Sequence, residues 1–266
     1  IERMYPEGLG TPGAAPAGSE ADDAPADHAD RSGARPVASA VDGYLQAIDQ
    51  AGLMEAATAA DVQFVMACRP GDFLVRGEPL LWVRPADRCR PELADAVRPL
   101  FMFGTSRTTE QDVEFAIDQM AEIAVRALSP GTNDPFTAVT CVDWLGSALA
   151  RIAAGDLHSP WRHDAGGKLR IVARVTTFPA YCDAAFDQVR HYAKGSLNVH
   201  VRLLEAIAKA LPHTKTDAQR AALLHHAELI VRQGRDSFPE AHDRCQIEAA
   251  YARATAPIMP ADAPTG

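Results

Sequence analysis

The sequence lacks the features that identify membrane-spanning, secreted or nucleic-acid-binding chains. No apolar run reaches the roughly 18 residues of a transmembrane helix, and no secretory leader is recognisable. The net charge is −9, and no basic stripe with interleaved aromatic residues occurs, so we expect no nucleic-acid partner. With 266 residues, the chain is still long enough to bury a sizeable core.

Cysteine is scarce and does not form a disulfide pattern. The five cysteines are Cys68, Cys89, Cys141, Cys182 and Cys245. Their number is odd and their spacing is wide, and three of them lie in apolar contexts. We therefore expect buried free thiols and a reducing compartment.

The signatures of common enzymes are also missing. The sequence contains no nucleophile elbow, no phosphate-binding P-loop and no dinucleotide fingerprint. His242 and Cys245 form only half of a zinc-binding pattern. No catalytic residue is assigned, no cofactor is expected, and the balance is against an enzyme.

The most informative stretch is 108–154, which has the pattern of two amphipathic helices joined by the loop 129–135. Thr108 and Gln111 have the spacing of a capping box, so the first helix is expected to begin there. Pro130 ends that helix, and Asp134 followed by Pro135 is typical of the start of the next. Because the loop is short, we expect the two helices to be antiparallel and to pack on each other.

The whole chain is expected to be α+β and mostly α. We predict the end of a helix over 1–6, a disordered linker over 7–36, a small β module over 37–86, a helical domain over 87–254 and a flexible tail over 255–266. The helical domain is expected to hold the central antiparallel helix pair and a β-hairpin near 161–172.

The β module is expected to contain strands at 41–48 and 62–67, with a short helix over 50–59 between them. The G-D-x-x-x-x-G-x-x-L spacing from Gly71 resembles half of a biotinyl- or lipoyl-type β-sandwich, in which Gly71 and Gly77 turn tight corners. No Met-Lys-Met or Asp-Lys-Ala attachment site is present. We therefore interpret this module as structural.

Two polar groups are candidate ligand sites, and each also has a structural interpretation. The first group is Arg107, Glu110, Gln111 and Asp112, which is either an inter-subunit or cation site or a solvated helix start. The second group is Arg126, Ser129, Thr132, Asn133 and Asp134, which is either an anion or hard-cation site or a turn with a helix cap. Asp118, Arg126 and Asp143 are further expected to pair across the two helices. A 19-residue helix is about 28 Å long, so the two groups meet only across a subunit interface.

Several stretches resemble one bacterial family of predicted membrane proteins, the domain of unknown function 2254 (DUF2254). The resemblance is carried by 107–117, by 126–138 with its Leu-Ser-Pro-Gly-x-Asn-Asp-Pro string, by Gly43-Tyr44, by 70–77 and by 184–188, and it spans nearly 36–250. Thr132 stands where many members have isoleucine.

The resemblance implies a membrane-spanning region before a soluble domain, with Ile1 at the end of a helix that leaves the membrane. Together with the free cysteines, which favour the cytoplasm, it leads us to expect a homo-oligomeric protein of the bacterial inner membrane with this domain in the cytoplasm. The resulting hypothesis is a regulatory or assembly domain that senses a ligand or gates a transport path. The alternative is a metal-assisted hydrolase with a site around Asn133 and Asp134.

Overall fold

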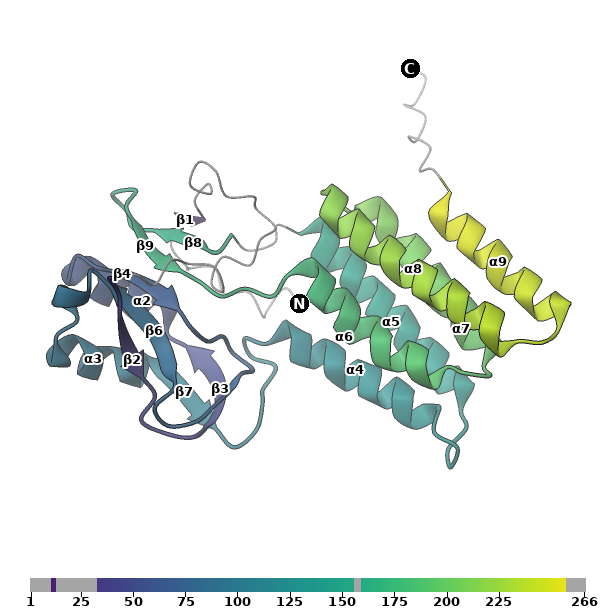
Figure 1. Ribbon diagram of the computed structural model, residues 1–266, viewed down its shortest axis with the longest axis horizontal. Coiled ribbons are helices and arrows are strands. Elements are labelled where there is room, and N and C mark those ends of the chain that lie inside the picture. The colour runs from purple at the N-terminus through teal and green to yellow at the C-terminus, as the bar shows by residue number, and fades with distance from the viewer. Residues whose placement is uncertain (1–10, 13–32, 156–158, 257–266) are drawn as a thin grey trace, which may run out of the picture. The chain divides into compact units, whose positions relative to one another are not determined.

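The protein is a mixed α+β structure in which helices predominate, as the sequence predicts (Figure 1). The computed structural model describes residues 11–12, 33–155 and 159–256. They form two compact units. The first unit comprises the described residues before Ile117 together with the segment that ends at Thr177, and the second comprises Ile117 to Gly155 and Phe178 to Ala256.

The first unit contains two β-sheets. The larger sheet has the strand order β1-β8-β9-β4-β6-β2, and its neighbouring strands are antiparallel except for the parallel pair β4 and β9. Its strands are β1 (Thr11–Pro12), β8 (Trp161–His163), β9 (Leu169–Val172), β4 (Gln63–Met66), β6 (Pro79–Arg84) and β2 (Arg35–Ala38). The smaller sheet consists of β5 (Phe73–Leu74), β3 (Gly43–Ile48) and β7 (Phe101–Gly104).

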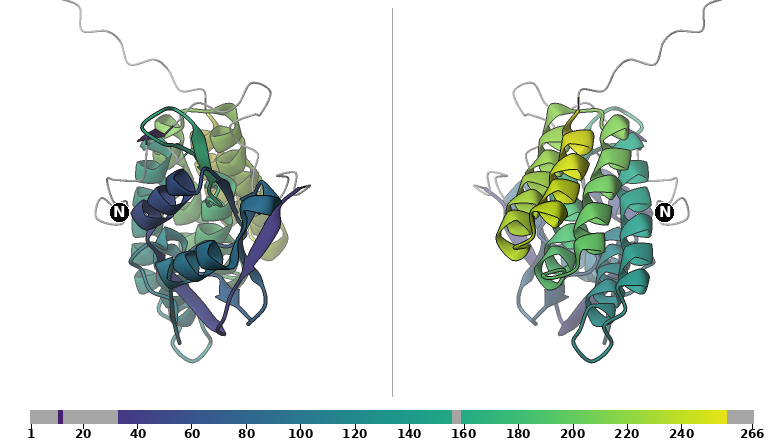
Figure 2. Two further views of the ribbon diagram at one scale, coloured as in Figure 1. Left: turned by 90° about the vertical axis from the view of Figure 1, so that its left-hand side faces the viewer. Right: turned by 90° about the vertical axis from the view of Figure 1, so that its right-hand side faces the viewer.

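Helices α2 (Gln50–Ala59) and α3 (Pro91–Val97) lie in the same unit and contribute to its core (left view of Figure 2). Asp49 begins α2 by accepting a hydrogen bond from the Gly52 amide. Strands and helices bury large apolar side chains against one another, among them Leu45, Leu53, Phe64 and Leu81. Each such side chain contributes about 1.5–3 kcal/mol relative to exposure.

The observed units differ from the domains expected from the sequence. The segment 87–116 and the hairpin of β8 and β9 belong to the first unit, because β7 pairs with β3 and β9 pairs with β4. Within the expected linker, β1 and the start of β2 are strands of the larger sheet. The rest of that linker up to residue 32, the segment 1–6 and residues 257–266 lie outside the described residues.

The second unit is built from helices. Its elements are α4 (Val113–Ala127, whose first turn belongs to the first unit), α5 (Pro135–Ala154), α6 (Phe178–Tyr192), α7 (Leu197–Ala210), α8 (Asp217–Ser237) and α9 (Ala241–Thr255). Helix α7 packs on α5, α8 and α9, and α6 packs on α8 (right view of Figure 2). Thr216 begins α8 with a capping box. No helix in the described part of the chain combines the length and the apolar character needed to cross a bilayer.

The central helix pair differs from the expectation in its packing. The chain reverses direction between α4 and α5 (Figure 1), but the close neighbour of α5 is α7 rather than α4. The buried stripe of α5 includes Val142, Leu145 and Leu149. Gly146 lies against Ala206 of α7, and a Cβ atom at Gly146 would lie 2.8 Å from the Ala206 Cβ. Small residues at this crossing let the two helices approach closely, which explains why α5 pairs with α7.

Candidate functional site

Asp112 directly precedes helix α4, and its carboxylate has two partners. Its Oδ1 accepts a hydrogen bond from the Phe115 amide at 2.9 Å, which caps the helix. Its Oδ2 accepts from Arg107 Nε at 2.9 Å and pairs with Arg107 Nη2 at 2.7 Å. The side chain of Asp112 is only 4% exposed. A buried carboxylate with two such nitrogen partners holds the start of α4 in one geometry.

Gly71 lies directly behind this carboxylate. A Cβ atom at Gly71 would come within 2.3 Å of Asp112 Oδ2, and the backbone has φ +98°. Both facts require glycine here. The Gly71 amide donates to the Leu45 carbonyl at 2.8 Å, which joins this loop to β3. The loop after β4 and the start of α4 therefore form one tightly packed corner.

Arg69 connects this corner to a third segment. Its Nη1 pairs with Glu114 of α4 at 2.7 Å and also donates to the Thr176 hydroxyl. Nearby, Arg174 Nη1 donates to Asp72 Oδ2 at 3.1 Å. We call this network of ion pairs the Asp112 cluster, and its charged members are Arg69, Asp72, Arg107, Asp112, Glu114 and Arg174.

The Asp112 cluster lies where the chain leaves the first unit. Helix α4 passes out of that unit after Ala116, and the segment with Arg174 and Thr176 passes out after Thr177. Because Arg69 holds both Glu114 and Thr176, both outgoing segments are tied to the loop after β4. The cluster therefore links the start of α4 and the segment with Arg174 and Thr176, and all of its residues belong to the first unit.

The first predicted group is only partly assembled. Arg107 and Asp112 contact each other, whereas Glu110 is exposed. The capping box expected from Thr108 and Gln111 is wrong, since α4 begins at Val113. The Gln111 side chain instead accepts a hydrogen bond from the Ile48 amide at 3.1 Å and donates one to the Ile48 carbonyl at 3.3 Å. The side-chain amide of Gln111 therefore binds the backbone of β3 and does not cap α4.

The second predicted group is a helix cap and a turn, as its structural interpretation predicted. Asp134 accepts hydrogen bonds from the Phe136 amide at 3.2 Å, the Thr137 amide at 3.1 Å and the Thr137 hydroxyl at 2.6 Å. The bonds from Thr137 lower the pKa of Asp134. Asn133 adopts a left-handed turn with φ +46°. Ser129 Oγ donates to the Arg126 carbonyl at 2.7 Å and lies 3.3 Å from the Thr132 hydroxyl.

Arg126 and Asp143, which were expected to pair across the two central helices, each pair with another residue. Arg126 pairs with Glu122 on its own helix, and Asp143 accepts from Arg202 of α7 at 3.0 Å. The pair of Asp143 with Arg202 follows from the packing of α5 on α7. The two predicted groups do not meet, because the 15 residues of α4 separate them by about 22 Å.

The loop with Asn133 and Asp134 is also the candidate hard-cation site. No set of three or more His, Cys, Asp or Glu side chains among the described residues is placed to hold a metal ion. The Asp134 carboxylate is already engaged by its own helix. The geometry of this loop is thus that of a capped helix start.

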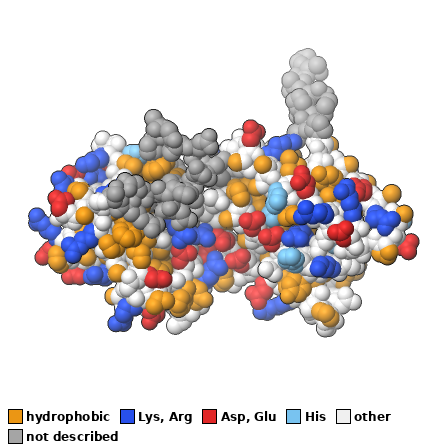
Figure 3. Space-filling view, viewed as in Figure 1, with side chains coloured by type: hydrophobic (Ala, Val, Ile, Leu, Met, Phe, Trp, Pro, Cys, Tyr) orange, Lys and Arg blue, Asp and Glu red, His pale blue; other side chains and the backbone are white. Residues whose placement is uncertain are grey.

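On the face shown in Figure 3, acidic and basic side chains are mixed over both units. The distinctive arrangement is therefore the Asp112 cluster, in which three arginines and three carboxylates from three segments meet.

Comparison with known proteins identifies the chain's relatives. A family model described as "Predicted membrane protein (DUF2254)" matches residues 9–209. The uncharacterised proteins Mb1321c of Mycobacterium bovis and Rv1290c of Mycobacterium tuberculosis are each 30% identical over 217 residues, which is 80% of this chain and 42% of each relative. The chain therefore spans less than half of the length of these relatives. No solved structure matches it. On the strength of the family match, the chain belongs to the DUF2254 family of predicted membrane proteins.

Proposed function

We propose that this chain is a regulatory and assembly domain of a homo-oligomeric bacterial inner-membrane protein, facing the cytoplasm. The observation that carries the proposal is the Asp112 cluster. It ties both segments that lead out of the first unit to one loop, through Arg69 and Asp112. A ligand that shifts this loop would change both connections together, which is the coupling a regulatory domain requires.

The membrane part of this proposal rests on the family. The family is described as predicted membrane proteins, and the chain matches 42% of the length of its mycobacterial relatives. We propose that the membrane-spanning region lies in the remaining share of such proteins. Within this architecture the module around Gly71 and Gly77 acts as a structural element rather than as a carrier of biotin or lipoate.

The assembly part is supported by two exposed aromatic side chains of α5. Phe136 is 77% exposed and Trp144 is 63% exposed, and residues eight apart lie on the same face of a helix. A second copy of the chain is the occupant we propose for this face.

The test is the subunit count of a full-length family protein that carries this domain, extracted in lipid nanodiscs and weighed by native mass spectrometry. We expect more than one copy in the wild type and a lower copy number when Phe136 and Trp144 are both replaced by serine. Met102→Ser, which alters an apolar side chain 48% exposed on β7, is the control and should leave the count unchanged. A wild-type monomer would contradict the proposal.

A further inference from the structure

A basic pocket lies in the first unit, away from the Asp112 cluster. It is an open hollow of about 450 Å³ between the end of α2, the end of β6 and the turn between β8 and β9. This volume lies in the range of small-molecule sites. Its lining residues are Gly33, Asp61, Val62, Gln63, Arg84, Pro85, Arg88, Lys168 and Leu169.

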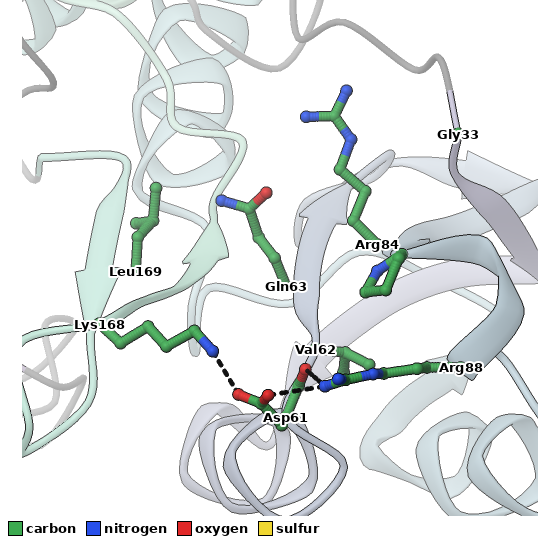
Figure 4. Close-up of a pocket in the computed structure, with 9 residues that line it drawn as sticks. Gly33, Asp61, Val62, Gln63, Arg84, Arg88, Lys168 and Leu169 are labelled. Atoms are coloured by element: carbon green, nitrogen blue, oxygen red, sulfur yellow. Dashed lines mark hydrogen bonds and ion pairs between the residues drawn. The ribbon is translucent and has the colours of Figure 1, made fainter.

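The charge of the pocket is positive, although the chain as a whole has a net charge of −9. Three cations, Arg84, Arg88 and Lys168, line the pocket against one carboxylate, Asp61. Figure 4 shows Lys168 reaching from the β8–β9 turn toward Asp61, with Arg88 approaching Asp61 from the opposite side. Lys168 and Arg88 therefore approach Asp61 from separate segments, and Arg84 lines another side of the pocket.

Asp61 holds these cations in place. Its carboxylate pairs with Arg88 at 2.6 Å, with Arg170 at 2.8 Å and with Lys168. These partners, Lys168 first, hold the pKa of Asp61 well below its usual range, so it stays ionised. Arg88 Nη1 also donates to the Asp61 carbonyl at 2.6 Å. Arg170 also pairs with Asp164 at 2.7 Å. Three cations, Arg88, Lys168 and Arg170, thus face two carboxylates, so positive charge remains for an anion, and these cations are already ordered before it binds.

The chemistry of the lining defines the ligand class. Guanidinium and ammonium groups together bind phosphate oxygens well. Val62, Pro85 and Leu169 supply an apolar wall beside them. We propose that this pocket binds a phosphate monoester or diphosphate group, carried either by a small soluble molecule or by an anionic lipid headgroup.

The binding test uses the 266-residue chain and two probes. Isothermal titration calorimetry with inorganic pyrophosphate tests whether the phosphate group belongs to a soluble molecule. Co-sedimentation with phosphatidylcholine vesicles, with or without phosphatidic acid, tests whether it belongs to a lipid headgroup. The variant Arg84→Gln/Lys168→Gln removes two pocket charges and leaves Asp61 paired with Arg88 and Arg170. The variant Arg202→Gln/Arg232→Gln removes two charges from the second unit and serves as the control.

We expect at least one probe to bind the wild type and the control alike, with affinity at least tenfold lower for the pocket variant. Dependence on pyrophosphate identifies a soluble ligand, and dependence on phosphatidic acid identifies a headgroup. Binding that falls equally in the control variant, or no binding of either probe, would overturn the proposal. Circular dichroism confirms that each variant is folded.

Discussion

At the scale of single residues, Asp112 combines two roles that substitution separates. Asparagine keeps an acceptor oxygen for the Phe115 amide and is a good helix cap, but it loses the charge that pairs with Arg107. We expect Asp112→Asn to lower the free energy of unfolding by about 1.5–3 kcal/mol, the usual range for a hydrogen bond to a charged group. Asp112→Ala should cost about 1 kcal/mol more, because the cap is lost as well.

The measurement is chemical denaturation of both variants and of Arg107→Gln. If the ion pair carries the effect, Asp112→Asn and Arg107→Gln combined should cost less than the sum of the two single changes. Additive costs would show that Arg107 and Asp112 act separately.

A buried histidine gives the second unit a pH dependence. His200 is fully buried, its Nδ1 lies 3.0 Å from the Ser196 carbonyl, and burial lowers its pKa from the ordinary 6.5. The unfolded chain therefore binds a proton at a higher pH than the folded chain does. Stability from this group is present above about pH 6.5 and is lost as pH falls through the lower folded-state value.

Denaturant titrations at pH 7 and pH 5 check this expectation. The wild type should lose free energy of unfolding over this interval, and His200→Gln should lose less. The same loss in both proteins would assign the pH dependence to other groups, among them His226, whose pKa is also lowered by burial.

At the scale of the elements, local sequence signals predicted local structure well. Helix α2 occupies 50–59 as expected, and the β8–β9 hairpin forms at the expected glycine turn. Asp134 caps α5 as its position before Pro135 predicted. Each of these features depends on residues close in sequence, whose spacing is readable without knowledge of the fold.

Contacts between segments that are distant in sequence could not be predicted from the sequence. The parallel pairing of β4 with β9 joins residues more than 100 positions apart and moves the hairpin into the first unit. Long sequence separation also hides the contacts Arg69–Glu114, Thr176–Glu114 and Arg174–Asp72. The sequence predicts a tight corner at Gly71, but nothing in its spacing indicates that Gly71 contacts Asp112.

The close crossing of α5 and α7 leads to a prediction about stability. Gly146 touches Ala206, so valine at 146 would force the helices apart. We expect Gly146→Val to destabilise the protein by about 1–3 kcal/mol, the usual cost of overpacking. Gly155→Val, at the exposed end of α5, tests whether loss of any glycine has this effect. Comparable thermal midpoints for the Gly146→Val variant and the wild type would contradict the close approach.

At the scale of the whole molecule, the central claim is that the Asp112 cluster couples the two segments leaving the first unit. Arg69 is the side chain that holds both, through Glu114 and Thr176. If the coupling exists, removal of Arg69 must loosen the two segments together. A purely local role would loosen only its own loop.

The most direct test is hydrogen–deuterium exchange on Arg69→Met, compared with the wild type and with Arg235→Met. Arg235 pairs with Glu248 on exposed helix faces and serves as the matched control. We predict that exchange rises about fivefold to tenfold in both 113–117 and 174–178, as expected for a local loss of about 1 kcal/mol. The control should show no rise in either segment. A rise in only one segment, or in neither, would contradict the coupling.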